Sequence, residues 1–440
     1  MLTSYLTPRA DRMTTPFAAP RRETLIAFII VCAFGILILP QFLGHWASDL
    51  AAVYIAGHMI ATGQDALVYA ADLGFFGGTP ASWATLVAQM NDQGLPAFPY
   101  IYPPLWAELL SPLTQRLTPQ QFFDLFGLVH TAAFCGSAWL AAKIARPSHM
   151  RFDLFICIVC MLAYFTTPLQ AAGLFNQPTM ITTFLTLLAV ERLQAGRAAS
   201  AGVALALAAA IKLTPAAFAL VFLIDRNWRA LAAFAVAGSL LALICFVASP
   251  ALSLQFLQQL PDVSQYSMVA KVNVSLIPAL TSLSSILGLT PTLDMSRNAV
   301  LLGPGLYELP RWITYAPKLM LLVSLILTWR IMAPAPPALR RAGATLLIAL
   351  ILPLFGPLGW LHYYVLPLLM LPMLSAALTP QRAIVALGMF GFANTLTAME
   401  MVSSLDKTLA LYNMFSVSVW LVVLGLAVWC LRRLAGQSAA

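Results

Sequence analysis

The stretch RRETLIAFIIVCAFGILILPQFLGHWASDL, residues 21–50, decides the fold because it contains an uncharged, mostly apolar run at 24–43 between two arginines and a carboxylate. An apolar helix of about 20 residues matches the roughly 30 Å hydrocarbon core of a bilayer. The run is longer than the core of a signal peptide and lacks a clear Ala-x-Ala cleavage site. We therefore predict a retained first span with its basic flank, Arg21 and Arg22, in the cytoplasm.

The rest of the chain continues this pattern. Of its 440 residues 60% are hydrophobic and only 9% are charged, and the mean hydropathy is +0.84. Apolar runs occur from end to end, so we predict an all-α integral membrane bundle of roughly 10–12 transmembrane helices and no separate soluble domain. The net charge of +8 comes from short basic clusters between apolar runs, which indicates orientation in the membrane and no nucleic-acid partner.

The basic clusters predict the topology and a single membrane domain. We expect a cytoplasmic tail at 1–23, one transmembrane catalytic domain at 24–431 with long outer loops at about 44–121 and 250–311, and a cytoplasmic tail at 432–440. The expected spans are 24–43, 122–145, 152–171, 178–194, 230–249, 312–331, 342–358, 362–378, 383–401 and 412–431.

Three shorter pieces do not fit full crossings. We expect a helix from Asp49 to Ala61 along the bilayer surface, capped by Ser48 or Asp49, and a re-entrant or surface helix at 105–117. Between two basic flanks, Pro215 breaks the apolar stretch 199–225 into two short helices and lifts Lys212 toward the outer face.

This topology places the unusual polar and aromatic side chains on the outer side. The candidate site residues are Asp49, Tyr100, Tyr102, Glu108, Asn176, Gln177, Lys212, Asn273, Trp360 and His362. The six cysteines all fall in apolar runs, where inert thiols are typical. Because no Asp-x-Asp pair, histidine-rich cluster or cysteine set accompanies them, we expect no metal and no other cofactor.

Each polar candidate also has a purely structural interpretation. Asp49 is either a helix cap or a catalytic carboxylate. Lys212 either snorkels to an interface or serves a functional site, and intramembrane ionisable groups favour function. His362 fits an aromatic belt as well as a site. The role of Glu108 stays open, and His58 has no assigned role.

The order of several weak motifs resembles glycosyltransferase family 87, the polyprenol-phosphate-mannose-dependent α-mannosyltransferase-like group of the GT-C superfamily. The motifs are SDLAAVYIAGHMIATGQDALVY after the first span, then YPPL, GLFNQPT, AGVALALAAAIKLTP, RNWRAL and WLHYY, over about 44–370. Where the family usually has a glycine before the glutamine of the third motif, this chain has Asn176.

The resemblance implies a GT-C membrane glycosyltransferase in a bacterial inner membrane. It implies transfer of mannose, or a related hexose or pentose, from a polyprenyl-phosphate donor to a hydroxyl of a glycolipid or glycan acceptor at the periplasmic face. It also implies that an acidic residue of the first outer loop is the base, and Asp49 matches it by position.

The residue types suit this chemistry. A carboxylate can take the proton of an acceptor hydroxyl, and a fixed cation in a water-poor site stabilises a leaving phosphate. We assign the role of general base to Asp49 and the stabilisation of the leaving phosphate to Lys212. His362 and Arg311 are lesser candidates for the phosphate. The aromatic and amide candidates, with Glu108, would bind substrate. We expect inversion, because the sequence offers no obvious close second carboxylate to form a covalent intermediate and Glu108 is the only outer acid with a claim to that place. The alternatives are a transporter or translocase of lipid-linked sugars, and an assembly protein.

Overall fold

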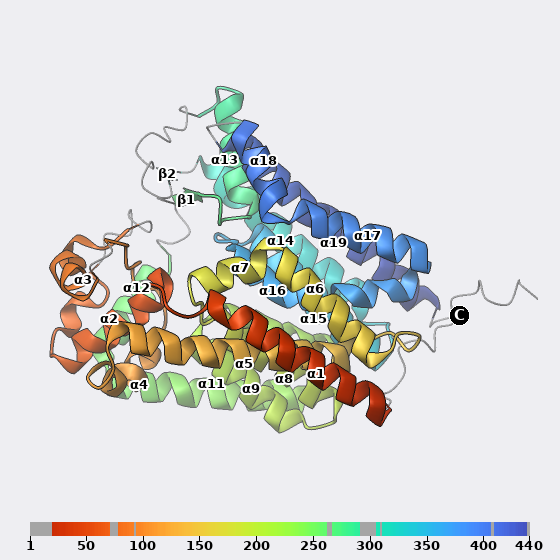
Figure 1. Ribbon diagram of the computed structural model, residues 1–440, viewed down its shortest axis with the longest axis horizontal. Helices are drawn as coiled ribbons and strands as arrows, with labels where there is room; N and C mark the ends of the chain where they lie inside the picture. Colours follow the sequence, from red (N-terminus) through yellow and green to blue (C-terminus); the bar gives the residue numbers. More distant parts are fainter. Residues whose placement is uncertain are drawn as a thin grey trace, which may run out of the picture.

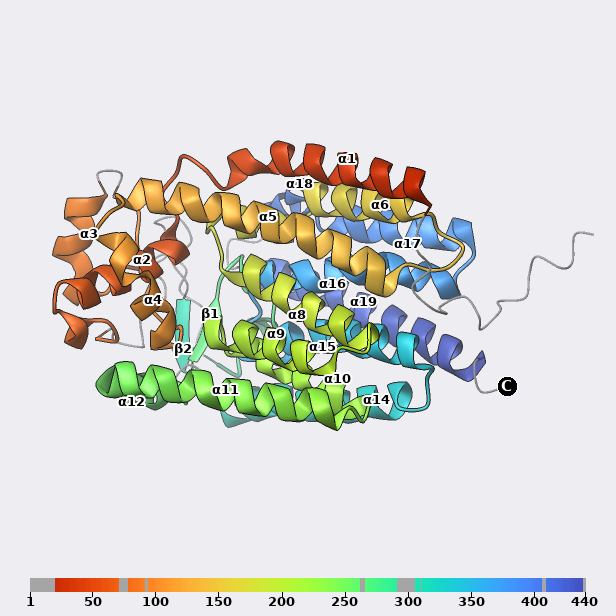
Figure 2. The same cartoon turned by 90° about the horizontal axis from the view of Figure 1, so that it is seen from below.

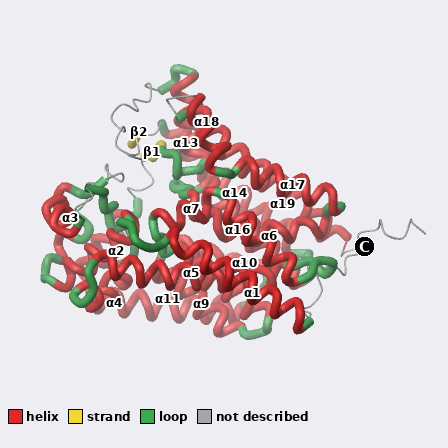
Figure 3. The backbone as a smooth tube through the Cα atoms, in the orientation of Figure 1, coloured by secondary structure: helices red, strands yellow, loops and turns green. Residues whose placement is uncertain are grey.

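The computed structural model describes residues 20–70, 78–91, 94–261, 266–290, 305–308, 310–405 and 409–437. Nearly all of the expected tail at 1–23, parts of both expected outer loops and the last three residues of the chain lie outside these ranges. Within them the chain is almost entirely helical, with one short hairpin (Figure 3). The prediction of an all-α membrane protein is confirmed.

Six helical segments are long and apolar enough to cross a bilayer. They are Arg21–Gln41, which joins α1 (Arg21–Ile38) to η3 (Leu39–Gln41), α5 (Pro119–Ala145), α11 (Trp228–Ala248), α14 (Arg311–Met332), α15 (Pro337–Phe355) and α19 (Ala410–Gln437). Two further crossings are possible if each of two bent pairs spans. These are α6 (Phe152–Phe165) with α7 (Thr167–Leu174), bent by 64°, and α17 (Pro380–Ala393) with α18 (Leu396–Leu405), bent by 55°.

By length and composition, six to eight segments of the described residues qualify as full spans, fewer than the roughly 10–12 transmembrane helices expected, and shorter apolar helices make up much of the difference. Prolines break the segment at 362–378 into η9 (Leu361–Tyr364), α16 (Val365–Met370) and η10 (Leu371–Ala377). The helix α8 (Thr179–Gln194) has only 16 residues. As expected, the chain breaks at Pro215, between α9 (Ala198–Ile211) and η6 (Thr214–Phe218), which leads into α10 (Ala219–Ile224).

The helices form an elongated bundle in which α5, α8, α9 and α11 lie side by side (Figure 2). Helix ends expected in the cytoplasm gather at one end, which we call the basic end. There Lys143 pairs with Glu191, and Arg340 and Arg341 pair with Asp225. Helix α1 begins at this end and α19 finishes there (Figure 2).

A small helical subdomain covers part of the opposite end of the bundle (Figure 1). It contains α2 (Ser48–Ala61), η4 (Asp65–Leu67), η5 (Ala81–Trp83), α3 (Ala84–Met90) and α4 (Pro104–Thr114), which share a second apolar core with the start of α5. The helices α12 (Pro250–Gln259) and α13 (Leu276–Ile286) also lie toward this end. An antiparallel hairpin pairs β1 (Tyr266–Val269) with β2 (Gly305–Glu308), and Tyr266 lies opposite Glu308.

Helix α2 differs from the predicted surface helix. It begins at Ser48 with no side-chain cap, so neither Ser48 nor Asp49 caps it, and its residues 50–57 are all buried. The reason is close packing on α4, since a β-carbon on Gly57 would lie only 3.3 Å from the carbonyl oxygen of Ala107. Asp49 therefore projects from an interior helix.

Candidate active site

Residues from distant parts of the sequence meet in one cavity of about 60 Å³, which we call the chamber. Its polar members are Asp49 at the start of α2, Gln177 in the α7–α8 turn, Lys212 at the α9–η6 break, and His362 in η9. The aromatic rings of Tyr102, Trp360 and Tyr363 line the chamber beside these polar groups. The predicted gathering of outer polar groups thus exists, although it involves only part of the predicted set.

The carboxylate of Asp49 is held by an amide. Nε2 of the buried Gln177 donates a hydrogen bond to Oδ2 of Asp49, and the Thr179 hydroxyl donates to Oε1 of Gln177 at 3.4 Å. Burial raises the pKa of Asp49 to about 6, against the opposing effects of the Gln177 hydrogen bond and the positive charge of Lys212. A carboxyl group with this pKa is ionised at neutral pH and can still accept a proton.

The ammonium group of Lys212 lies beside this carboxylate without pairing with it. Nζ donates to the hydroxyl of Thr179 at 3.2 Å and lies 4.3 Å from the ring centre of Tyr363 and 5.6 Å from that of Tyr102. In the described part of the chain no carboxylate forms an ion pair with Lys212. Lys212 is only 8% exposed, and burial lowers its pKa to about 7 against the opposing charge of Asp49. The protonated side chain faces the chamber with N–H donors left for an anion, and a bound anion would favour that protonated form.

His362 is the other nitrogen base of the chamber. Its ring stacks on Trp360, 6.5 Å between centroids, and meets Tyr363 edge to face at 4.8 Å. Among the described residues, its buried Nε2 has no hydrogen-bond partner. Buried polar atoms are nearly always satisfied, so this nitrogen is available to a ligand in the chamber.

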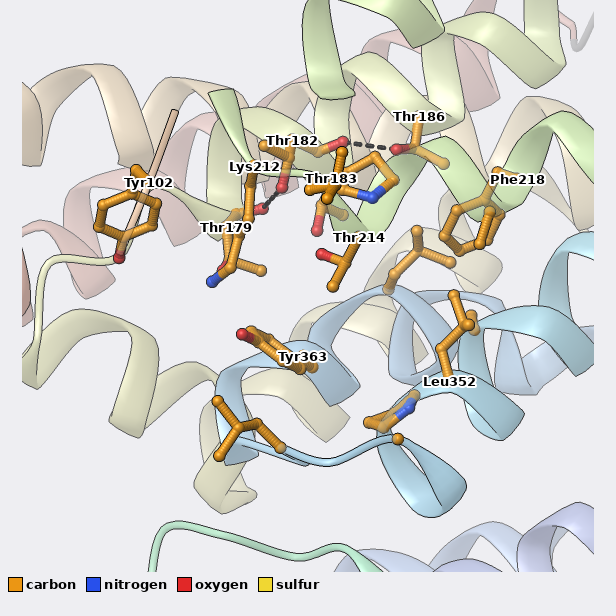
Figure 4. A pocket seen from close by; sticks show the side chains of 18 of the residues that line it. Tyr102, Thr179, Thr182, Thr183, Thr186, Lys212, Thr214, Phe218, Leu352 and Tyr363 are labelled. Atoms are coloured by element: carbon orange, nitrogen blue, oxygen red, sulfur yellow. Dashed lines mark hydrogen bonds between the residues drawn. The ribbon is translucent and has the colours of Figure 1, made fainter. Parts of the chain in front are cut away.

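An apolar groove of about 440 Å³ adjoins the chamber and shares Ile101, Tyr102, Lys212 and Tyr363 with it. Figure 4 shows the groove, with Lys212, Tyr102 and Tyr363 toward one end and Phe218 and Leu352 toward the other. The groove is thus lined mainly by apolar side chains, and Lys212 lies where it adjoins the chamber.

One wall of the groove is a row of threonines on α8, Thr179, Thr182, Thr183 and Thr186 (Figure 4). The hydroxyls of Thr182 and Thr186 bond to main-chain carbonyls one turn earlier, at 3.1 and 2.7 Å, which leaves their methyl groups to the groove. Our sequence analysis missed this row. The spacing i, i+3, i+4, i+7 in TMITTFLT is the signal that reveals it, because it marks one face of a helix.

Asn176, predicted to bind substrate, lies behind the chamber and does not line it. It is fully buried, and its φ of +47° places it in the left-handed region. The amide of Asn176 bonds to Gly173 O and that of Gln177 to Ala172 O, both at 3.0 Å, which is a Schellman ending for α7. The family's usual glycine suits the same position, because glycine and asparagine tolerate this conformation best.

Tyr100 and Glu108 also lie outside the chamber lining. The Tyr100 hydroxyl donates to Pro103 O at 2.8 Å and accepts from the amide of Ala107 at 3.1 Å, so it secures the first turn of α4. The Glu108 carboxylate accepts a hydrogen bond from the hydroxyl of Ser249. Both side chains are therefore occupied by contacts within the protein.

Asn273 joins the outer loop to the WLHYY motif. Its Oδ1 accepts from the amide of Gly359 at 2.9 Å, and its Nδ2 donates to Met268 O at 2.8 Å. It is fully buried and does not line the chamber, whereas Trp360, opposite it in an isolated bridge, does. Asn273 thus fixes the wall that carries Trp360 and His362.

The described residues contain no group of three histidine, cysteine, aspartate or glutamate side chains placed to hold a metal ion. The six cysteines are all free.

Comparison with known families identifies the enzyme class. The model of glycosyltransferase family 87 matches residues 100–357, more than half of the chain. The chain belongs to glycosyltransferase family 87. This family 87 enzyme is therefore a multi-pass membrane glycosyltransferase, which sets aside the transporter and assembly-protein alternatives.

Among solved structures, the crystal structure of ArnT from Cupriavidus metallidurans bound to undecaprenyl phosphate is similar to the family 87 chain. The sequence identity is 13% and the TM-score 0.40, and the match covers 96% of this chain and 79% of ArnT. No curated protein matches the sequence.

Proposed function

We propose that this enzyme transfers a sugar from a polyprenyl-phosphate donor to an acceptor hydroxyl, with Asp49 as general base and Lys212 at the donor phosphate. The observation that carries the proposal is the position of Lys212, a buried amine with no ion-pair partner among the described residues, where the polar chamber adjoins the apolar groove. An anionic headgroup on a long apolar chain matches both environments at once.

The reaction follows from the two charged groups. The acceptor oxygen forms a bond to the anomeric carbon while the bond from that carbon to the phosphate oxygen breaks. The acceptor proton passes to the carboxylate of Asp49, which Gln177 holds in place. The polyprenyl phosphate leaves as an anion, and the ammonium of Lys212, with His362 nearby, stabilises its growing charge.

This mechanism is a single displacement, which inverts the anomeric centre. A covalent intermediate would need a second carboxylate about 5 Å from the first, placed to attack the anomeric carbon. Glu108, the outer acid considered for that place, is bonded to Ser249 and does not line the chamber.

The remaining features of the proposal come from the family resemblance and the chemistry of the site. The transferred sugar is mannose or a related hexose or pentose, and the acceptor is a glycolipid or glycan. The chamber faces the periplasmic side of a bacterial inner membrane, with the basic end in the cytoplasm. The reaction needs no metal, because Lys212 supplies the positive charge at the phosphate.

The decisive experiment uses purified protein in liposomes with radiolabelled polyprenyl-phosphate mannose, glucose and arabinose, and extracted envelope glycolipids or glycans as acceptors. We expect transfer from one donor, and a loss of about 10²- to 10⁴-fold in kcat for Asp49→Asn. Asp65→Asn is the matched control, since Asp65 is an exposed acid of the same outer segment. Equal transfer by Asp49→Asn and parent would remove Asp49 from the mechanism, and donor flipping without transfer would favour a translocase.

A further inference from the structure

A buried polar network lies directly behind the chamber. Nδ2 of Asn176 donates to the carbonyl oxygens of Phe123, at 2.8 Å, and Phe42, at 3.4 Å, while its Oδ1 contacts Nδ1 of His130 at 2.5 Å. Because carbonyl oxygens only accept, the NH₂ group must face them. Oδ1 is then the acceptor, and the fully buried His130 donates from Nδ1.

This network fixes a strained turn that ends in the active site. Asn176 has a left-handed backbone, and Gln177, the next residue, donates to Asp49. The side chain of Asn176 ties this turn to the loop after η3 and to two points on α5, at Phe123 and His130. The direction in which Gln177 leaves the turn is therefore set by contacts on the far side from the chamber.

We propose that Asn176 and His130 form a positioning pair that holds Gln177 against Asp49 without touching substrate. The inference rests on the proposed function only in calling Asp49 the base. A glycine at 176 would supply the same backbone conformation but none of the three side-chain contacts. The pair therefore adds rigidity beyond what the turn itself requires.

The network predicts a change in the ionisation of Asp49. A hydrogen bond to the charged form of a carboxylate lowers its pKa, so loosening Gln177 should raise the pKa of Asp49. The other titratable groups near Asp49 are Lys212, at the α9–η6 break, and the phenols of Tyr102, before α4, and Tyr363, in η9. Tyr102 hydrogen-bonds Gln177 and Lys212 reaches it through Thr179, so these two groups contact Gln177 from the chamber side, whereas Asn176 and His130 hold the turn from behind. His362, which also lines the chamber, is held by its stacking partners.

Asn176→Gly tests the pair because it keeps the turn and removes the anchors. The titration of Asp49 is followed in liposomes by infrared difference spectroscopy, using the carboxyl band that disappears in Asp49→Asn. We expect the midpoint to rise by about one pH unit, and the acid limb of kcat to move with it, while KM for the donor changes less than about twofold.

His130→Leu should also raise the midpoint, and the double variant should add little to Asn176→Gly, because both changes remove the same contact between Asn176 and His130. Asn394→Gly is the matched control. Asn394 is a buried asparagine at the end of α17 that donates to Phe390 O at 3.0 Å, away from the chamber lining. Its replacement should lower thermal stability and leave the Asp49 midpoint in place.

An Asp49 midpoint within about 0.3 pH units of the parent in both Asn176→Gly and His130→Leu would overturn the positioning role. The spectroscopic readout does not depend on activity. If the parent protein transfers no sugar and the Asp49 midpoint still shifts in the variants, the positioning pair is supported and the proposed function is rejected. If Asn176→Gly cannot be purified, the Asp49 midpoint in His130→Leu decides the question. A raised midpoint supports the pair, and an unchanged midpoint refutes it.

Discussion

Replacing Lys212 with methionine should lower kcat about 10²- to 10³-fold without unfolding the protein. Methionine has a similar length and reach but no charge, so it keeps most of the packing against Tyr102 and Tyr363. What it removes is the hydrogen bond of the ammonium group to Thr179 and the positive charge at the junction of chamber and groove.

The magnitude follows from how the ammonium is used. It carries three N–H donors, and Thr179 takes one, so two remain for a phosphate oxygen. Losing one preorganised donor at a developing oxyanion costs about 2.7–4 kcal/mol in the transition state, which corresponds to the stated rate loss. The folded protein should become more stable in return, because an apolar group replaces a buried amine that forms no ion pair within the described ranges.

Single-turnover transfer from the donor and inhibition by free polyprenyl phosphate are the matched assays. Both should weaken in Lys212→Met, since both depend on the phosphate. Lys318→Met is the control, because Lys318 also lies over a tyrosine ring, that of Tyr315 at 5.9 Å, but outside the chamber and groove. Transfer by Lys212→Met at more than about a third of the parent rate would refute the phosphate role.

Four further predictions test the site and its frame. Activity should be greatest between about pH 6 and 7 and fall on both sides, because Asp49, with a pKa raised by burial to about 6, must be ionised and Lys212, with a pKa lowered by burial to about 7, must be protonated; a flat profile from pH 5 to 8 would contradict this. Burial raises the pKa of Asp49 from 3.8 to about 6, so the folded state loses stability as pH rises between these two values and stays less stable above them. Asp49→Asn should therefore melt no lower than the parent at pH 8. Gly359→Ala should lower the melting temperature by several degrees, because the new β-carbon would lie 2.8 Å from Cβ of Ser275 and clash with Pro353 O. Incubation with EDTA should leave transfer intact, and its restoration by Mg²⁺ or Mn²⁺ after a loss would show a metal requirement.

Much of the architecture was predictable because hydrophobic run length and loop charge act locally. The long spans and the break at Pro215 follow from such rules, and so does the common location of Asp49, Gln177, Lys212 and His362. The span count failed where local rules stop. Prolines turned 362–378 into three short helices, and α6 and α7 meet at a sharp bend that composition alone does not reveal.

The polar candidates show a different limit. Asn176 and Gln177 are neighbours of nearly the same chemistry, yet one anchors the turn from behind while the other reaches Asp49. Asn273 bonds to main-chain groups on both sides of its amide, which no spacing rule distinguishes from a substrate contact. An amide at a sharp turn satisfies whichever backbone groups the tertiary fold brings near it. The charged pair Asp49 and Lys212 was easier to place, because burying an ionisable group is costly and implies a use.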